Sequence, residues 1–332
     1  MKSALLAAAL LLSALFLPKL TGHDPYLVGV MIEVLRMAAL ASAWNIIGGY
    51  AGQYSFGHAA YFGAGAYATS IILTAYPATD PLLALVAGIA VSCLIALVTG
   101  SIVFRLRGHY FALASIAVAE IVRLSVLNLE FTGGAQGLLL SDLSFHGLDL
   151  NSKTPFYFGM LMLLALTMGV TALLSRARMG YYLQAIREDE DAASSLGIDI
   201  ARCKNSALVV SAALTSVAGS LYALYIRFID TTAVLDLRLS IEIILTAIIG
   251  GVGTIWGPLL GAILLVPLAE MLRSNFFGQT LVSLGVVSPD SPAGRFFADG
   301  LAHAHVLVYG VITVLCILFM PTGLLGLFRR ER

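Results

Sequence analysis

Long apolar runs, separated by short polar segments, repeat from one end of this chain to the other. Most of these runs approach the roughly 20 residues that a helix needs to cross a bilayer. The pattern therefore predicts an all-α polytopic membrane protein with about ten transmembrane helices. The expected spans are 4–20, 26–47, 56–76, 82–104, 109–128, 155–175, 205–226, 241–252, 256–272 and 302–320.

The first apolar run has an alternative interpretation. Lys2 precedes it, as a basic residue precedes the apolar region of a signal peptide, but the run is long and no small-x-small cleavage site follows Pro18. We therefore expect 4–20 to be retained as a helix. The whole chain, 1–332, is then one transmembrane domain.

Composition agrees with the hydropathy pattern. The chain is 59% hydrophobic and 11% charged, whereas a soluble domain has about 25% charged residues. Mean hydropathy is +0.92. The formal net charge is zero, so nothing indicates a nucleic-acid partner.

The distribution of Lys and Arg sets the expected orientation. With the N-terminus inside and ten spans, the loops on the inner side hold more Lys and Arg than those on the outer side, as cytoplasmic loops do. Both termini and the loop 176–204 are then cytoplasmic. The predicted spans lie in the lipid bilayer.

Two glycine-rich blocks, 46–52 and 248–253, each end one apolar run and precede another. They predict a pseudo-repeat of two helical hairpins, as transporter folds often contain. Glycine allows close packing of helices, and it also allows a chain break where protein or water covers the backbone. Close packing explains most of these glycines. The candidates for a substrate pathway or gate are Gly49, Gly52, Gln53, Ser55, Gly57, His58, Gly250, Gly251 and Gly253.

A Glu-x-x-Arg pattern recurs three times within the predicted spans. Its i,i+3 spacing places both side chains on one helix face, where they can neutralise each other. Intramembrane ion pairs suggest function, although structural pairing near the interface is the simpler explanation. Glu242, at the outer start of its span, is interpreted as having no local basic partner and is a candidate for contact with a partner protein. The pairs are Glu33/Arg36, Glu120/Arg123 and Glu270/Arg273.

One strongly charged island lies in the cytoplasmic loop 176–204. A hydrophilic segment in so apolar a chain indicates docking onto a soluble partner, and a merely solvated loop is the alternative. The candidate docking residues are Arg187, Glu188, Asp189, Glu190, Asp191, Ala192, Ala193 and Gly197.

Catalytic and metal-binding patterns are missing from the sequence. None of the lysines follows a glycine, so the G-x-x-x-x-G-K-[ST] phosphate loop is absent and this chain does not bind ATP in that way. Cys93, Cys203 and Cys316 have no paired spacing, and the histidines are scattered. We expect no cofactor, no metal and no enzymatic activity in this chain.

The order and spacing of several short motifs resemble the permease subunits of bacterial branched-chain amino-acid ABC transporters, of the LivM type, over nearly the whole chain. The matching segments are 49–53, 55–60, 110–114, 119–123, 132–137, 185–190, 250–258 and 321–324. The charged island is similar to the E-A-A-x-x-x-G loop of importers in this class. It departs from that pattern in two ways, because Asp191 replaces the Glu and the later Leu-Pro is missing.

This resemblance implies partners. A second, related permease subunit completes the membrane pathway, two cytoplasmic ATP-binding subunits hydrolyse ATP, and a periplasmic binding protein delivers substrate to the inner membrane. In such importers a short cytoplasmic helix fits a groove in the ATPase and transmits its closure to the pathway. The resemblance implies such a helix over 182–197, with its acidic residues in the first turns, where they complement the helix dipole. Branched-chain amino acids are the expected substrates. Urea, amides or aromatic acids, an ion-coupled secondary transporter and a membrane enzyme are the alternatives.

Overall fold

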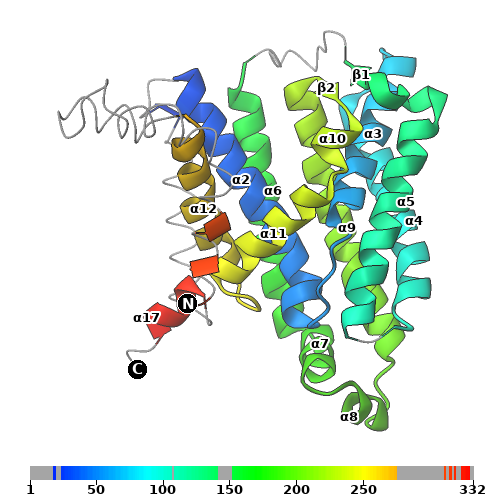
Figure 1. Cartoon of the computed structure of the whole chain (residues 1–332), viewed down its shortest axis with the longest axis vertical. Coiled ribbons are helices and arrows are strands. Elements are labelled where there is room, and N and C mark those ends of the chain that lie inside the picture. Colours follow the sequence, from blue (N-terminus) through cyan, green and yellow to red (C-terminus); the bar gives the residue numbers. More distant parts are fainter. Residues whose placement is uncertain are drawn as a thin grey trace, which may run out of the picture.

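A computed structural model of the chain describes residues 18–19, 24–106, 108–140, 152–274, 310–311, 314–315, 318 and 323–329. These residues are mostly helical (Figure 1), which confirms the all-α prediction. The longer helices are α2 (Pro25–Asn45), α3 (His58–Ala75), α4 (Pro81–Val103), α5 (His109–Asn128), α6 (Thr154–Arg176), α7 (Arg178–Glu188), α9 (Ile200–Ile226), α11 (Leu237–Gly250) and α12 (Gly257–Arg273).

Shorter elements complete the described chain. The π-helix η1 (Ile46–Tyr50) continues α2. Two antiparallel strands, β1 (Leu138–Leu139) and β2 (Phe228–Ile229), pair Leu138 with Ile229. The others are the 3-10 turns η2 (Glu130–Thr132) and η3 (Gly134–Gln136) and the helices α8 (Glu190–Ser195), α10 (Thr231–Val234) and α17 (Leu324–Arg329).

Five helical stretches among the described residues are long and apolar enough to cross a membrane. The predicted span 4–20 and most of 302–320 lie outside the described residues, so the count of ten stays a prediction. The largest boundary difference is at α9, which begins at Ile200 rather than 205, because the Asp199 carboxylate accepts a hydrogen bond from Arg202 N at 3.0 Å and caps the helix. The five stretches are Pro25–Tyr50, α4, α5, α6 and α9.

Asp-Pro pairs start two of the spans. The carboxylates of Asp24 and Asp80 accept hydrogen bonds from the backbone two residues on, each at 2.8 Å. Pro25 and Pro81 then occupy the first helical position, where the missing N–H is not needed. A local sequence signal therefore fixes where these helices begin.

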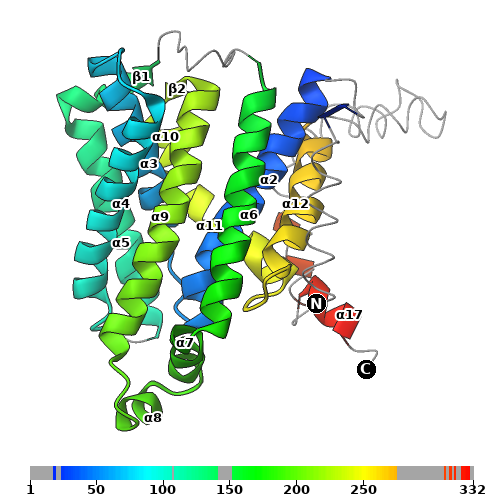
Figure 2. The ribbon, with the colours of Figure 1, turned by 180° about the vertical axis from the view of Figure 1, so that it is seen from behind.

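Small residues bring α3, α4 and α9 together on one side of the bundle (Figure 2). A Cβ added to Gly65 would lie 2.2 Å from Ser216 O, and one added to Gly219 would lie 2.0 Å from Phe62 O. Only glycine therefore allows these backbones to approach so closely. Close helix packing is therefore the role of Gly65 and Gly219.

The two glycine blocks differ in structure. The second block connects α11 and α12, which pack directly against each other. After the first block, residues 51–57 run without regular structure, and α2 packs mainly on α6 and α12 while α3 packs on α4 and α9. The first block is therefore not a tight helical hairpin like the second, and an internal repeat stays a prediction.

Candidate functional site at the turn junction

The charged island folds as two helices rather than as the one predicted over 182–197. Asp189 is extended (φ −158°, ψ 114°), and its carboxylate accepts hydrogen bonds from Asp191 N at 2.9 Å and Ala192 N at 3.0 Å. It therefore ends α7 and caps α8. Glu190 and Asp191 lie in the first turn of α8 as expected, but Glu188 is the last residue of α7, where the helix dipole does not favour an anion.

Arg187 connects this segment to both glycine blocks. Its guanidinium donates a hydrogen bond to Gly49 O at 2.8 Å. A Cβ on Gly253 would lie 2.8 Å from the same nitrogen, and one on Gly52 would lie 2.9 Å from Arg187 Cγ. Gly52 and Gly253 also have positive φ values, +68° and +75°, which disfavour other residues. Glycine is thus required here by space and by backbone conformation.

Asn45 joins the two blocks from inside the bundle. Its side-chain amide donates to Thr254 O and its carbonyl oxygen accepts from Gly253 N, both at 2.8 Å. The residue is fully buried, so these bonds satisfy polar groups that water does not reach. Sequence analysis missed Asn45, although a lone amide just before a glycine block in an apolar span was a usable signal.

Glu190 points inward as well. It forms an ion pair with Lys204 at 2.5 Å and accepts a hydrogen bond from Gln53 Nε2 at 3.2 Å. Lys204 is 0% exposed, and its ammonium lies 6.0 Å from the centre of the Phe104 ring. Lys204 also escaped sequence analysis. Its position near the start of a long apolar run was the only signal.

We call this arrangement the turn junction. It ties α7 and α8 to the two glycine blocks and to α9 through side chains rather than through backbone pairing. Six residues from two predicted groups, the pathway candidates and the docking candidates, meet there with the two residues that were missed. Its members are Asn45, Gly49, Gly52, Gln53, Arg187, Glu190, Lys204 and Gly253.

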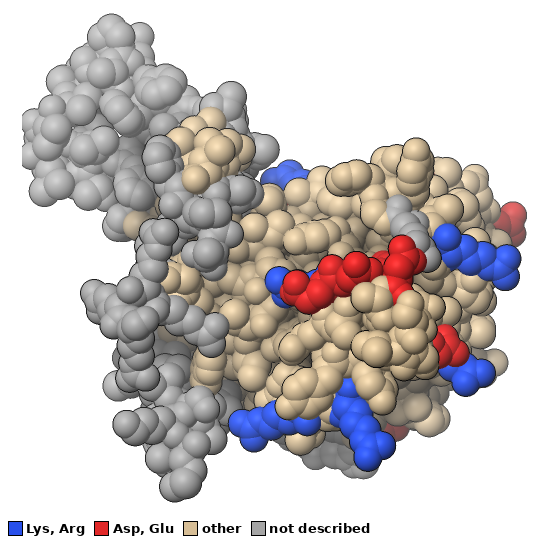
Figure 3. All heavy atoms as spheres, turned by 90° about the horizontal axis from the view of Figure 1, so that it is seen from below, with Lys and Arg blue, Asp and Glu red and all other residues tan. Residues whose placement is uncertain are grey.

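The opposite side of α7 and α8 is free of the bundle. Glu188, Asp189 and Asp191 are exposed there, and Figure 3 shows acidic side chains gathered in a strip on this end of the molecule. Ala192 is also exposed, whereas Ala193 is buried against the bundle. Exposed apolar side chains accompany the acids, namely those of Tyr181, Tyr182 and Leu196. Gly197 ends α8 with φ +81° and no atom within 4 Å of an added Cβ.

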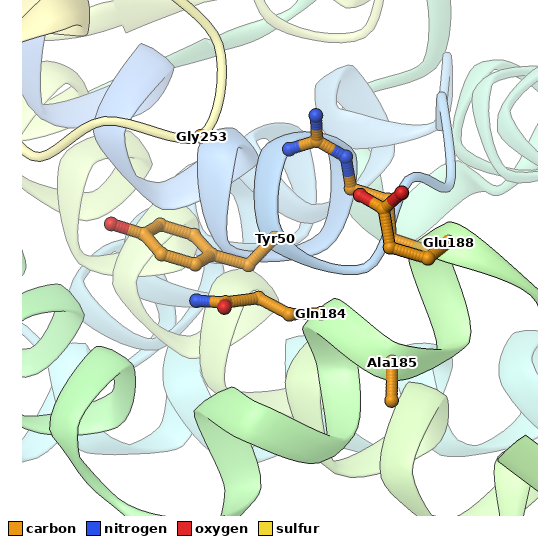
Figure 4. Close-up of a pocket in the computed structure, with 6 residues that line it drawn as sticks. Tyr50, Gln184, Ala185, Glu188 and Gly253 are labelled. Carbon is orange, nitrogen blue, oxygen red and sulfur yellow. The ribbon is translucent and has the colours of Figure 1, made fainter.

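A cavity of about 400 Å³ opens between η1, α7 and the second glycine turn. Figure 4 shows Tyr50 and Gln184 extending side by side, with Glu188 across from them. A guanidinium, a carboxylate, a phenol and an amide therefore share one pocket beside the turn junction. Its lining is Tyr50, Gln184, Ala185, Arg187, Glu188 and Gly253.

Other predicted pathway residues lie deeper and serve packing. His58 Nε2 is 2.8 Å from Ser211 Oγ, which itself donates to Ala43 O at 2.6 Å, and this chain of contacts joins α3, α9 and α2. Ser55 O accepts from the indole of Trp44 at 2.8 Å, and Gly57 N donates to Ser55 Oγ at 3.3 Å. These residues hold helices together and are not brought into the turn junction.

Gly250 and Gly251 allow close backbone contact at the second turn. A Cβ on Gly250 would lie 1.8 Å from Gly257 O, and Gly251 has φ +127°. The backbone of Gly251 also lies against Gly323, at the start of α17. This turn is therefore packed on both sides.

The three Glu-x-x-Arg patterns form ion pairs in different surroundings. Arg36 pairs with Glu33 and is buried between the rings of Phe62 and Tyr222, 5.5 and 5.1 Å from their centres. In the other pairs, Glu120–Arg123 and Glu270–Arg273, the arginine is more exposed than Arg36. The interpretation of Glu242 as lacking a basic partner is wrong, because Arg238 Nε lies 3.1 Å from its carboxylate at i,i+4.

Within the described residues no group of three or more His, Cys, Asp or Glu side chains is placed to hold a metal ion. The described chain is thus a bundle of apolar helices with a folded polar segment tied to its turns. This combination defines a multi-spanning membrane protein with a folded polar segment outside its apolar helices. The chain belongs to the family described as the permease component of branched-chain amino acid transport systems, whose model matches residues 26–319. This is a permease family rather than an enzyme family.

Several curated relatives support the assignment. The chain is 28% identical over 309 residues to the high-affinity branched-chain amino acid transport system permease protein LivM of Salmonella typhimurium, covering 86% of this chain and 72% of that protein. The same values hold for LivM of Escherichia coli. A probable LivM of Methanocaldococcus jannaschii is 25% identical over 280 residues, covering 80% and 77%. No solved structure matches the chain.

Proposed function

We propose that this chain is the membrane-spanning subunit of an ATP-driven, binding-protein-dependent importer of branched-chain amino acids. The observation that carries the proposal is the family match across residues 26–319, which covers nearly all of the predicted spans. The named substrates of the relatives LivM from two bacteria support leucine, isoleucine and valine as cargo.

The partners follow from the importer class. A second, related permease subunit lies beside this chain in the inner membrane, and a periplasmic binding protein delivers the amino acid. Two cytoplasmic ATP-binding subunits supply the energy, so this chain itself is not an enzyme. Both termini and the loop 176–204 lie in the cytoplasm, and residues 1–332 form one permease domain.

The α7–α8 segment is the docking site for an ATP-binding subunit. Its outer side offers acidic and apolar side chains together, a mixture suited to a protein groove with a polar rim. Its inner side is bonded to the first glycine turn and to Gln53 through Arg187 and Glu190, and Arg187 also lies against Gly253 of the second turn. A displacement of α7 and α8 therefore pulls directly on the turns at the end of α2 and α11, which act as the gate.

Reconstitution tests the function. The chain is purified with the products of its neighbouring transport genes and placed in liposomes, and ATP hydrolysis and uptake are measured with leucine or urea. We expect leucine and the binding protein together to raise both rates. Stimulation by urea and not by leucine would contradict branched-chain amino acids as the substrate. The absence of any ATP-binding partner would contradict the assignment as an ATP-driven importer.

A further inference from the structure

The bundle has two kinds of exposed helix surface, and only one of them suits lipid. α4 carries no charged residue, and its exposed positions are large and apolar, with Leu83 64%, Leu94 62% and Ile102 62% exposed. Exposure of such apolar side chains to lipid tails carries no free-energy cost. The surface of α4 is therefore a lipid-facing surface.

One flank of α5 is different. Ile116, Glu120, Arg123 and Leu127 follow one another at i, i+4, i+7 and i+11, which places them in one stripe along the helix. None of the four is buried. Glu120 and Arg123 form an ion pair at 2.5 Å, yet their side chains remain 46% and 25% exposed. Because α5 runs from His109 to Asn128, Glu120 lies near the middle of the span.

The start of α11 faces this stripe with charges of its own. α11 contacts α5, and Figure 1 shows it beginning about halfway down the bundle. Its N-cap residue, Asp236, interacts electrostatically with Arg123. Arg238 is 65% exposed and pairs with Glu242. Asp236 thus brings the charged start of α11 close to Arg123 of α5 near mid-depth.

Charged side chains at this depth face protein or water rather than lipid. Soluble subunits are confined to the two sides of the membrane and do not reach the middle of a span. The charges also occur in pairs of opposite sign, so that the same surface on a two-fold-related chain presents a complementary pattern. A membrane-embedded chain of the same fold satisfies all of these conditions.

We propose that a second permease chain packs against the α5–α11 face, which is formed by Ile116, Glu120, Arg123, Leu127, Arg238 and Glu242. This rests on the proposed function, in which two permease chains share one pathway. The stripe of α5 and the first turns of α11 are then covered by the partner chain, and α4 remains against lipid.

Photocross-linking in native membranes tests the face. Benzoylphenylalanine replaces Ile116 or Leu127 on α5, or Leu94 on α4 as the matched control, while the neighbouring transport genes are expressed. We expect a cross-linked product with a permease chain at 116 and 127 and lipid adducts alone at 94. Mass spectrometry identifies the cross-linked partner. A second copy of this chain or a related permease as that partner supports packing of a permease chain on the α5–α11 face. Lipid adducts alone at 116 and 127, or a permease product at 94, would overturn it.

A second variant does not depend on the photoreactive residue. Glu120→Leu combined with Arg123→Leu removes the charges but keeps the apolar character that lipid prefers. We expect co-purification of the second permease chain to fall at least fivefold, whereas Leu94→Ala leaves it unchanged. Unchanged co-purification of the double variant would overturn the proposal. If leucine uptake by the unmodified complex persists in that case, the importer function stands and only the face is wrong.

Discussion

The contact between α3 and α9 and the turn junction hold the protein together in opposite ways. At Gly65 and Gly219 the backbones of α3 and α9 meet with no room for a methyl group. At the turn junction, the α7–α8 segment is held by Arg187, Glu190 and Lys204, whose long side chains reach between elements.

This difference makes the α3–α9 contact a fixed part of the molecule and the α7–α8 segment at the turn junction a movable one. Backbones packed through glycine have no second arrangement at similar energy, because any sliding opens voids or creates clashes. Hydrogen bonds from long side chains can break on one carbonyl and form on another with little change in packing. We therefore expect substitutions in the first region to affect folding, and loss of the hydrogen bond from Arg187 in the second to affect transport more than folding. The buried ion pair of Glu190 and Lys204 is different, because it contributes to stability as well.

Lys204→Met is expected to have the largest effect and to show that the junction also contributes to stability. It leaves Glu190 without its buried cation, and loss of one partner of a buried ion pair costs about 3 kcal/mol. A lower melting temperature in detergent and loss of leucine uptake are the expected results. Arg202→Met is the matched control, because Arg202 is 87% exposed and lies two residues away. Equal melting temperatures for the two variants would contradict a stabilising role for the buried ion pair of Glu190 and Lys204.

Gly219→Ala is expected to destabilise the fold by about 2 kcal/mol through overpacking. The added Cβ would lie 2.0 Å from Phe62 O, so α3 and α9 must separate. Gly169→Ala on α6 is the control, since an added Cβ there meets nothing within 4 Å. The yield of monodisperse protein and the melting temperature measure both. If Gly219→Ala is as stable as Gly169→Ala, the contact between α3 and α9 does not depend on glycine at position 219.

Arg187→Lys sharpens the comparison because it keeps the charge and removes the planar guanidinium. One hydrogen bond to Gly49 O is lost or weakened, which costs about 1 kcal/mol of stability. We expect leucine uptake to fall about tenfold while ATP-binding subunits still co-purify. Arg178→Lys, on an exposed position of α7, is expected to leave uptake unchanged. Normal leucine uptake by Arg187→Lys would show that the hydrogen bond to Gly49 does not transmit movement of α7 to the first glycine turn.

Glu188→Lys is expected to have the smallest effect on the fold, within about 0.5 kcal/mol, because the side chain is exposed. Its effect should appear only in docking, as weaker co-purification of the ATP-binding subunits. Glu130→Lys, on the loop after α5, serves as a control for charge alone. Undiminished binding by the Glu188 variant would remove the outer side of α7 from the docking surface.

Within the described residues, sequence predicted the positions of the long apolar helices well, because hydropathy and length identify helices that must satisfy their own backbone in lipid, whereas the count of ten spans stays a prediction. It also found most of the turn junction, because glycine blocks and charged islands stand out in an apolar chain. It missed Asn45 and Lys204, whose importance arises only when distant segments meet. It also missed the break at Asp189, because a good N-cap residue inside a run of helix formers competes with helix continuation.

The length of α11 has a consequence for biosynthesis. Its 14 residues extend roughly 21 Å, short of the hydrocarbon thickness of about 30 Å. Arg238 and Glu242 in its first half oppose partitioning into lipid still further. During synthesis this segment is therefore a poor substrate for insertion on its own, and it enters the membrane together with α12. The ribosome must complete residues well beyond Gly250 before the second glycine turn takes its place.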